Sequence, residues 1–134
     1  MPDESVSFCP PRCVFVYGTL RRGGSNDITR LQPAARYLGT ARVAGVLYHL
    51  GAYPGMTLGG DGWVQGEVYA IEPALEAQLD EIEGLGADPM DEYAKREVVV
   101  DVDGRALPCL VYEINPRCIV AAPCIAHGDW LAPG

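Results

Sequence analysis

The sequence predicts one α+β domain, built on a mostly antiparallel curved sheet or small barrel, with few flanking helices. Two observations favour this class. Signals for hairpins dominate the chain, and the strand-like segments do not alternate regularly with helical ones. The chain has 134 residues, of which 49% are hydrophobic and 21% charged, a composition that suits one folded core. We expect residues 1–12 to form a flexible tail and residues 13–134 to form the domain.

The N-terminal elements begin with a short apolar strand. Residues 13–17 are β-branched or aromatic apart from Cys13, a pattern typical of a buried strand. Residues 23–26 then read as a loop. A short helix is predicted over 27–31, ended by Pro33.

The middle of the chain predicts long strands joined by turns. Residues 37–50 alternate small, apolar and basic side chains, which indicates one long strand or two short ones, with Gly45 at a bulge or bend. Residues 51–56 predict a turn, and Gly59-Gly60-Asp61-Gly62 a hairpin connection. The two-faced alternation over 63–71 predicts a further strand.

Residues 73–84 predict the clearest helix in the chain. Pro73 suits a first turn, and Gly84 suits the position after the last one. The spacing of Leu75, Leu79 and Ile82 defines a stripe facing the core.

The C-terminal half predicts a loop, a hairpin and an irregular tail. Residues 86–91 form the loop, and residues 93–102 and 106–114 are the two strands of the hairpin. Asp103-Gly104 between them is a strong turn signal. The proline-containing tail is expected to be irregular.

Charge and cysteine content restrict the partners. The net charge of −8 disfavours nucleic acid and anionic membranes as partners. No apolar run reaches the roughly 18 residues that span a bilayer, and the first dozen residues do not resemble a secretory signal, so we expect the cytoplasm. The odd number of cysteines disfavours a disulfide framework, and their spacing with His49 and His127 does not match a zinc site. We therefore expect no metal and no cofactor.

The acidic residues of the predicted helix differ in the direction they face. At about 100° per residue, Asp80 and Glu81 point toward solvent, whereas Glu83 returns beside the apolar stripe and Glu76 is less close to it. A carboxylate in that position is costly unless it is paired or used. Glu83 is thus either an ion-pair partner of a basic residue such as Arg96 or a general acid/base whose pKa is raised by burial.

Tyr17-Gly18-Thr19-Leu20, at the end of the first strand, is a candidate ligand loop. Successive backbone N–H groups in such a turn can hold an anion, although a strand followed by a plain turn explains the same residues. The hydroxyls of Tyr17 and Tyr93 either face a pocket or satisfy ordinary buried hydrogen bonds. His127 and Asp129 suggest a catalytic pair, but a capping or packing role fits better because no nucleophile motif accompanies them.

Several motifs in this order carry a family resemblance. They are Val14–Arg21, Gln65–Tyr69, Leu79–Gly84, Tyr93 with Arg96, and the supporting segments Gly51–Met56 and Gly128–Trp130. Over residues 13–131 the chain resembles the gamma-glutamylcyclotransferase-like family, including the gamma-glutamylamine cyclotransferases and small bacterial members. The resemblance implies a small mixed barrel, and a reaction in which a γ-glutamyl group cyclises to 5-oxoproline and an amine is released.

The same resemblance implies roles for particular residues. The amides of residues 17–20 would hold the glutamyl group, Tyr93 would line the site, and Glu83 would be the catalytic acid/base. The substrate's own α-amine is the nucleophile of this intramolecular aminolysis, so no protein nucleophile is needed. Three hypotheses remain open: an enzyme acting on a small γ-glutamyl amine or amide, a non-catalytic small-molecule-binding or regulatory module, and an enzyme acting on a larger carrier-bound or antibiotic precursor. The leaving amine and the oligomeric state are not predicted.

Overall fold

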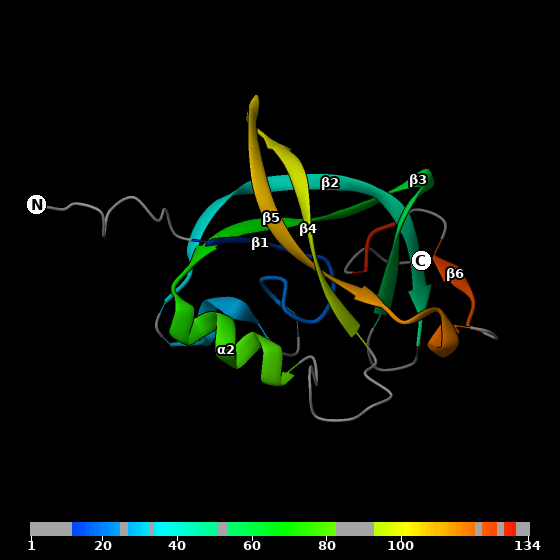
Figure 1. Cartoon of the computed structure of the whole chain (residues 1–134), viewed down its shortest axis with the longest axis horizontal. Coiled ribbons are helices and arrows are strands. Elements are labelled where there is room, and N and C mark those ends of the chain that lie inside the picture. The colour runs from blue at the N-terminus through cyan, green and yellow to red at the C-terminus, as the bar shows by residue number, and fades with distance from the viewer. Residues whose placement is uncertain are drawn as a thin grey trace, which may run out of the picture.

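The computed structural model describes residues 12–24, 27–32, 34–50, 54–82, 93–119, 122–125 and 128–130. Its elements in chain order are β1 (Arg12–Val16), η1 (Ile28–Arg30), β2 (Arg36–His49), β3 (Pro54–Ile71), α2 (Pro73–Ile82), β4 (Tyr93–Val102), β5 (Arg105–Ile114), η2 (Pro116–Ile119) and β6 (Cys124–Ile125). The six strands form one curved sheet in the order β4-β5-β1-β3-β2-β6, across which β2 arches (Figure 1).

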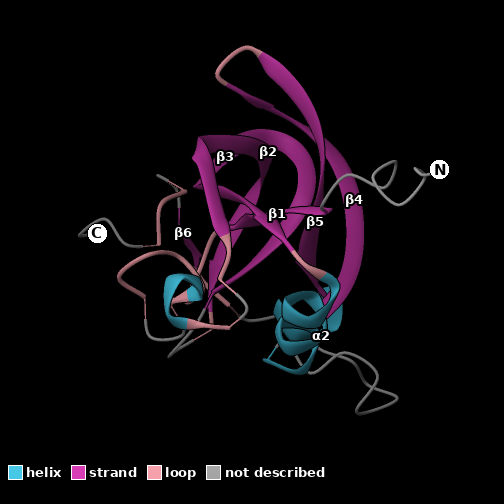
Figure 2. Ribbon diagram, turned by 90° about the vertical axis from the view of Figure 1, so that its left-hand side faces the viewer, coloured by secondary structure: helices cyan, strands magenta, loops and turns pink. Residues whose placement is uncertain are grey.

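The sheet is mixed, and with a single α-helix among the described residues it confirms the predicted α+β class. The pairs β1–β3, β2–β3, β2–β6 and β4–β5 are antiparallel, whereas β5 runs parallel to both β1 and β3. The end strands are β4 and β6; the small barrel stays a prediction. Figure 2 shows α2 at the lower ends of β4 and β5.

The prediction of a hairpin connection at residues 59–62 is wrong. Strand β3 continues through these residues and pairs with β2 on both sides of them, with Trp63 opposite Ala44 and Leu58 opposite Gly45. Residues 59–62 therefore form a bulge, and the predicted irregularity at Gly45 is confirmed. Gly59 and Gly60 adopt φ values of +86° and +89°, which glycine tolerates. A glycine-rich stretch gives the same signal for a bulge as for a hairpin.

The other predicted elements in the N-terminal half are close to those observed. Strand β1 differs from the prediction by one residue, and the predicted short helix is the 3-10 segment η1. The second half of the predicted turn at 51–56 belongs instead to β3, which begins at Pro54. Residues 51–53 lie outside the described part.

The C-terminal half departs from the sequence prediction mainly in its tail. The β4–β5 hairpin turns at Asp103 and Gly104, whose φ values of 51° and 82° are those of a tight hairpin turn. The tail is more regular than predicted, since it contains η2 and the two-residue strand β6, which pairs with β2. An element of two residues is too short to leave a periodic pattern. The predicted loop at 86–91 lies outside the described residues.

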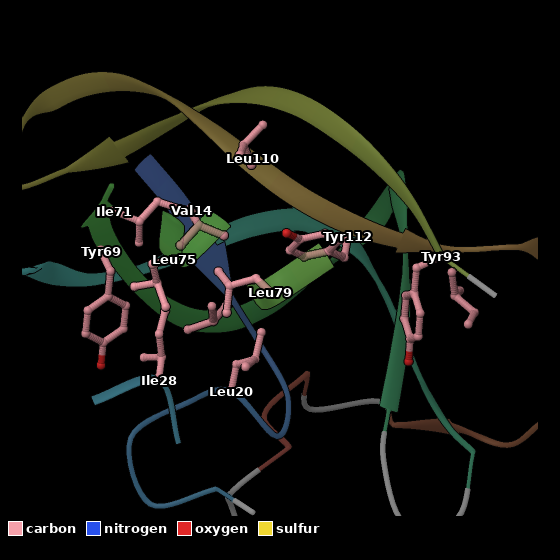
Figure 3. Packing of buried hydrophobic residues seen from close by; sticks show 12 residues of the cluster. Val14, Leu20, Ile28, Tyr69, Ile71, Leu75, Leu79, Tyr93, Leu110 and Tyr112 are labelled. Carbon is pink, nitrogen blue, oxygen red and sulfur yellow. The ribbon is translucent and has the colours of Figure 1, made fainter. Parts of the chain in front are cut away.

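The two faces of the sheet bury separate apolar clusters. Val14 and Val16 of β1 pack with Leu75 and Leu79 of α2 on one face (Figure 3). The alternate residue Phe15 packs on the other face with side chains that include Val43, Val64, Val68, Val100 and Val111. Strand β1 is thus buried on both faces, so that its carboxyl end carries the following loop out of the centre of the fold.

Candidate functional site

The loop that follows β1 contains two backbone donors that have no acceptor among the described residues. The carbonyl of Gly18 accepts from the amide of Arg21 at 3.0 Å, and the carbonyl of Leu20 accepts from the amide of Ile28 at 2.9 Å. Within the described part of the chain, the amides of Gly18 and Leu20 donate to no acceptor, although both residues are buried. Buried backbone amides are seldom left without a partner. This loop can therefore supply hydrogen bonds to a ligand.

Gly18 is required by its contact with the start of β3. A Cβ atom at this position would lie 2.6 Å from Cγ of Pro54, inside the contact limit. Its backbone does not adopt a positive φ, so the reason for glycine here is close approach rather than turn geometry.

The hydroxyls of Tyr17 and Tyr93 converge on the same end of β3. The Tyr17 hydroxyl donates to the carbonyl of Tyr112 at 2.6 Å and accepts from the amide of Met56 at 3.3 Å. The Tyr93 hydroxyl donates to the carbonyl of Pro54 at 2.7 Å. The structure thus brings Tyr17, Gly18 and Tyr93 together around Pro54, with both hydroxyls bonded to the backbone.

Helix α2 shares its apolar cluster with the loop. Leu75 and Leu79 are fully buried and lie in one cluster with Leu20, as Figure 3 shows. The last helical residue is Ile82, whose side chain is not described. The proposed acid/base Glu83 and the capping Gly84 lie outside the described residues.

The prediction that Asp80 faces solvent is wrong. Asp80 accepts hydrogen bonds from the Tyr112 hydroxyl at 2.7 Å and from Nζ of Lys95, which also contacts Glu76 at 2.6 Å. The β4–β5 hairpin covers this flank of α2, which helical periodicity alone does not reveal. Glu81 is exposed, as predicted. Burial opposes ionisation of Glu76, but hydrogen bonds and charge from Lys95 and Arg12 lower its pKa overall.

A half-buried ionic cluster beside the loop was missed by the sequence analysis. Nε of Arg21 lies 2.9 Å from Oε2 of Glu67, and Nη1 of Arg21 lies 2.6 Å from Oδ1 of Asp129. The side chains of Arg21 and Glu67 are only 12% and 10% exposed. We call Arg21, Glu67 and Asp129 the arginine clamp.

Electrostatics favour the charged form of Arg21. Burial by itself lowers the pKa of a guanidinium, but the hydrogen bonds to Glu67 and Asp129 outweigh that effect and raise the pKa of Arg21. The Tyr69 hydroxyl donates to Oε1 of Glu67 at 3.1 Å, and burial together with this negative charge raises the pKa of Tyr69. In the sequence, Glu67 alternates with Tyr69 and Ile71 and so lies on the same face of the strand as these two large side chains. That alternation was the sequence signal for burial of Glu67.

Asp27 caps the short helix that follows the loop. Its carboxylate accepts from the amides of Gly23 and Thr29, both at 2.8 Å, and from the Thr29 hydroxyl at 2.6 Å. Burial raises the pKa of this group, but these hydrogen bonds lower it overall. The loop is therefore fixed at both of its ends.

The remaining candidate side chains lie away from the loop donors. Arg96, the suggested partner of Glu83, is exposed, and its Nε contacts Oε1 of Glu113 at 3.2 Å. A surface hollow of about 540 Å³ is lined by Thr40, Ala41, Arg42, Trp63, Gln65 and Asp101. None of the predicted site residues lines this hollow.

The described residues were also compared with the requirements of a metal site, a reactive thiol and a membrane-spanning helix. No three His, Cys, Asp or Glu side chains among them are grouped so as to hold a metal ion. Cys13 and Cys109 are free neighbours on β1 and β5, and burial raises the pKa of Cys109 to about 12. No helix in the described ranges is long and apolar enough to cross a membrane.

Comparisons with known proteins agree on one family. Residues 14–132 match the family described as "Gamma-glutamyl cyclotransferase, AIG2-like". A putative gamma-glutamylcyclotransferase of Vibrio cholerae is 49% identical over 119 residues, covering 87% of this chain and 93% of that protein. The gamma-glutamylcyclotransferase family protein YtfP of Escherichia coli is 38% identical over 121 residues, covering 88% and 95%.

A solved structure supports the same assignment. The crystal structure of an AIG2-like protein from Mus musculus aligns with a TM-score of 0.73 and 25% identity, covering 94% of this chain and 92% of the mouse chain. The alignment extends over nearly the whole of both proteins. The chain therefore belongs to the gamma-glutamyl cyclotransferase, AIG2-like family.

Proposed function

We propose that this protein is a gamma-glutamyl cyclotransferase, which converts a γ-glutamyl amine or amide to 5-oxoproline and releases the amine. The observation that carries the proposal is the pair of amides at the buried residues Gly18 and Leu20, which have no acceptor in the described part of the chain. They occur in the loop that the family resemblance assigns to the glutamyl group. A small anionic or carbonyl-bearing ligand supplies the acceptors that these donors lack.

The reaction needs proton transfer and orientation rather than a protein nucleophile. The substrate's α-ammonium loses a proton, and its nitrogen attacks the γ-carbonyl carbon to form a tetrahedral intermediate. The attacking nitrogen loses a second proton, the γ-carbon–nitrogen bond breaks, and the leaving nitrogen takes up two protons and departs as an ammonium. One carboxyl group that accepts each proton from the attacking nitrogen and donates it to the leaving nitrogen serves both transfers.

We assign this proton transfer to Glu83. Its spacing of four residues after Leu79 predicts a place on the apolar side of a helix, and Leu79 itself packs in one cluster with Leu20. Burial of a carboxyl group raises its pKa toward the range of an effective acid/base. Asp80 and Glu76 on the same helix are engaged with Lys95 and are poor alternatives.

We assign the substrate's α-carboxylate to the amides of Gly18 and Leu20. We assign residues 17–20 and Tyr93 to the same binding position, which is supported by the hydrogen bonds of the Tyr17 and Tyr93 hydroxyls to the adjacent backbone of β3. An anchored α-carboxylate holds the α-amine close to the γ-carbonyl, and such orientation accounts for a large share of the rate of intramolecular reactions.

The test is to incubate the purified protein with a panel of γ-glutamyl amines and γ-glutamyl amino acids and to measure 5-oxoproline. We expect Glu83→Gln to lower kcat by about 10²-fold or more, because the amide cannot carry the proton. The matched control is Glu81→Gln, which removes an exposed carboxylate two residues earlier and should leave the rate unchanged.

Three results would change the proposal in different ways. Activity that survives in Glu83→Gln removes the role of Glu83. Binding of 5-oxoproline without turnover of any substrate favours a non-catalytic small-molecule-binding module. Turnover restricted to large carrier-bound substrates would identify the leaving group, which the chain does not specify. A cytoplasmic location stays a prediction.

A further inference from the structure

We infer that the arginine clamp is a positioning device, in which Glu67 and Asp129 hold Arg21 so that the amides of Gly18 and Leu20 are fixed for ligand binding. The inference rests on the proposed function and adds three residues to it. None of the three is assigned contact with substrate. They act through the loop backbone.

Arg21 is connected to both donors through the main chain. It directly follows Leu20, and its amide bonds to the carbonyl of Gly18, which closes the turn between them. Its side chain is fixed at Nε and Nη1 by two carboxylates that come from different segments. A planar guanidinium held at two nitrogens has little rotational freedom. The orientation of Arg21 thereby restricts that of the turn.

Glu67 grips the loop at two consecutive residues. Its Oε2 accepts from the Arg21 side chain, and its Oε1 accepts from the amide of Arg22 at 3.0 Å. The Tyr69 hydroxyl also donates to Oε1 and fixes the carboxylate. Because both oxygens are engaged by donors, Glu67 is poorly placed to accept a substrate proton. Its geometry suits a positioning residue instead.

Asp129 joins the C-terminal segment to the same loop. The neighbouring Gly128 accepts at its carbonyl from the amide of Gln65 at 2.7 Å and has a φ of +71°. The ring of Trp130 lies 5.2 Å from that of His49. This segment is therefore fixed on β2 and β3, and Asp129 extends from it to Arg21.

Kinetics separate positioning from proton transfer. The α-carboxylate does not react, so its binding strength is similar in the ground and transition states, and weakening it raises KM more than it changes kcat. Lysine at position 21 keeps the positive charge but loses the two-nitrogen fork. We expect Arg21→Lys to raise KM about tenfold or more, while kcat changes by no more than about threefold. The control Arg12→Lys alters an arginine–carboxylate pair whose arginine is 50% exposed at the far end of β1, and should change neither constant.

A second variant tests positioning without catalysis. Asp129→Asn removes one clamp carboxylate from a residue far from the loop in sequence, so any effect on the loop amides passes through space. In assigned ¹H–¹⁵N spectra of the ligand-free protein, we expect it to shift the Gly18 and Leu20 signals. Asp101→Asn, at an exposed position, should leave them in place.

The inference requires both results. An unchanged KM in Arg21→Lys, or unshifted Gly18 and Leu20 signals in Asp129→Asn, overturns it, and a lower melting temperature with unchanged KM marks the clamp as purely structural. If Arg21→Lys does not fold, the KM of Asp129→Asn and its Gly18 and Leu20 amide signals test the inference instead. If the wild-type protein forms no 5-oxoproline, the proposed function fails, and the amide signals alone then decide the inference.

Discussion

Single hydroxyl groups hold the start of β3 against the candidate loop. The hydroxyls of Tyr17 and Tyr93 are bonded to backbone groups of Met56 and Pro54, and Pro54 is also the residue that excludes a side chain at Gly18. A tyrosine in this site therefore stabilises the backbone that forms it, whether or not it also contacts a ligand.

Removing one of these hydroxyls should lower the stability of the fold by a measurable amount. Tyr93→Phe leaves the buried carbonyl of Pro54 without its donor, so we expect the free energy of unfolding to fall by about 1–2 kcal/mol. Urea denaturation monitored by tryptophan fluorescence measures the change. Tyr37→Phe is the control, because the Tyr37 side chain is about half exposed and should tolerate the loss. Equal effects of the two variants would show that the Pro54 bond contributes nothing specific.

The loop and η1 form one element that depends on an ionised carboxylate. The pKa of Asp27 is lowered in the folded protein relative to its ordinary value. A depressed pKa stabilises the fold above the unfolded-state pKa, and this stabilisation is lost as pH falls through the folded-state value. The same sign applies to Glu76 on α2.

The resulting prediction concerns acid stability. We expect the free energy of unfolding to fall as pH drops below about 4, and Asp27→Asn to flatten that dependence. The variant should also be less stable at pH 7 by about 1 kcal/mol, because an amide has one oxygen where the carboxylate uses both oxygens to accept from three donors. Chemical denaturation at several pH values measures both effects. If the free energy of unfolding of Asp27→Asn fell with pH as steeply as that of the wild type, Asp27 would not contribute to the acid sensitivity.

Across the whole molecule, the C-terminal segment closes against β3 at Gly128. A Cβ atom there would collide with the carbonyl oxygen of Trp63, and the backbone also has a positive φ. We expect Gly128→Ala to destabilise the fold by more than about 1 kcal/mol and to speed hydrogen exchange at the Gln65 amide. Gly104→Ala is the matched control, because Gly104 has a φ of +82° but no atom within 4 Å of an added Cβ. If both variants lost the same free energy of unfolding, the contact between the added Cβ atom and Trp63 would have no energetic cost.

The sequence-based predictions differ from the structure mainly where segments far apart in the chain make contact. Local patterns were enough for β1, α2 and the β4–β5 hairpin, because each depends on its own periodicity and turn residues. They were not enough for the bulge at 59–62, where one glycine-rich signal fits two backbone geometries. Asp80 was misplaced because periodicity describes a helix without its neighbours.

The candidate site was predicted in part. Residues 17–20 and Tyr93 come together in the structure, whereas Glu83 is outside the described part and stays a prediction. The arginine clamp joins residues 21, 67 and 129, and only the folded chain brings them into contact. The sequence placed each of them in a separate motif and gave no sign that the three meet.

The central position of β1 has a consequence for how the chain acquires its structure. This strand lies between β3 and β5, and its residue Cys13 is opposite Cys109 in the parallel pairing of β1 with β5. The two partner strands are therefore far apart in the sequence. During synthesis, β1 leaves the ribosome long before β5 exists, and its apolar residues remain unpaired on one edge for that interval. Such an edge attracts other extended chains. Rapid translation of the remaining residues, or a chaperone that covers Val14–Val16, would therefore favour a high yield of native protein.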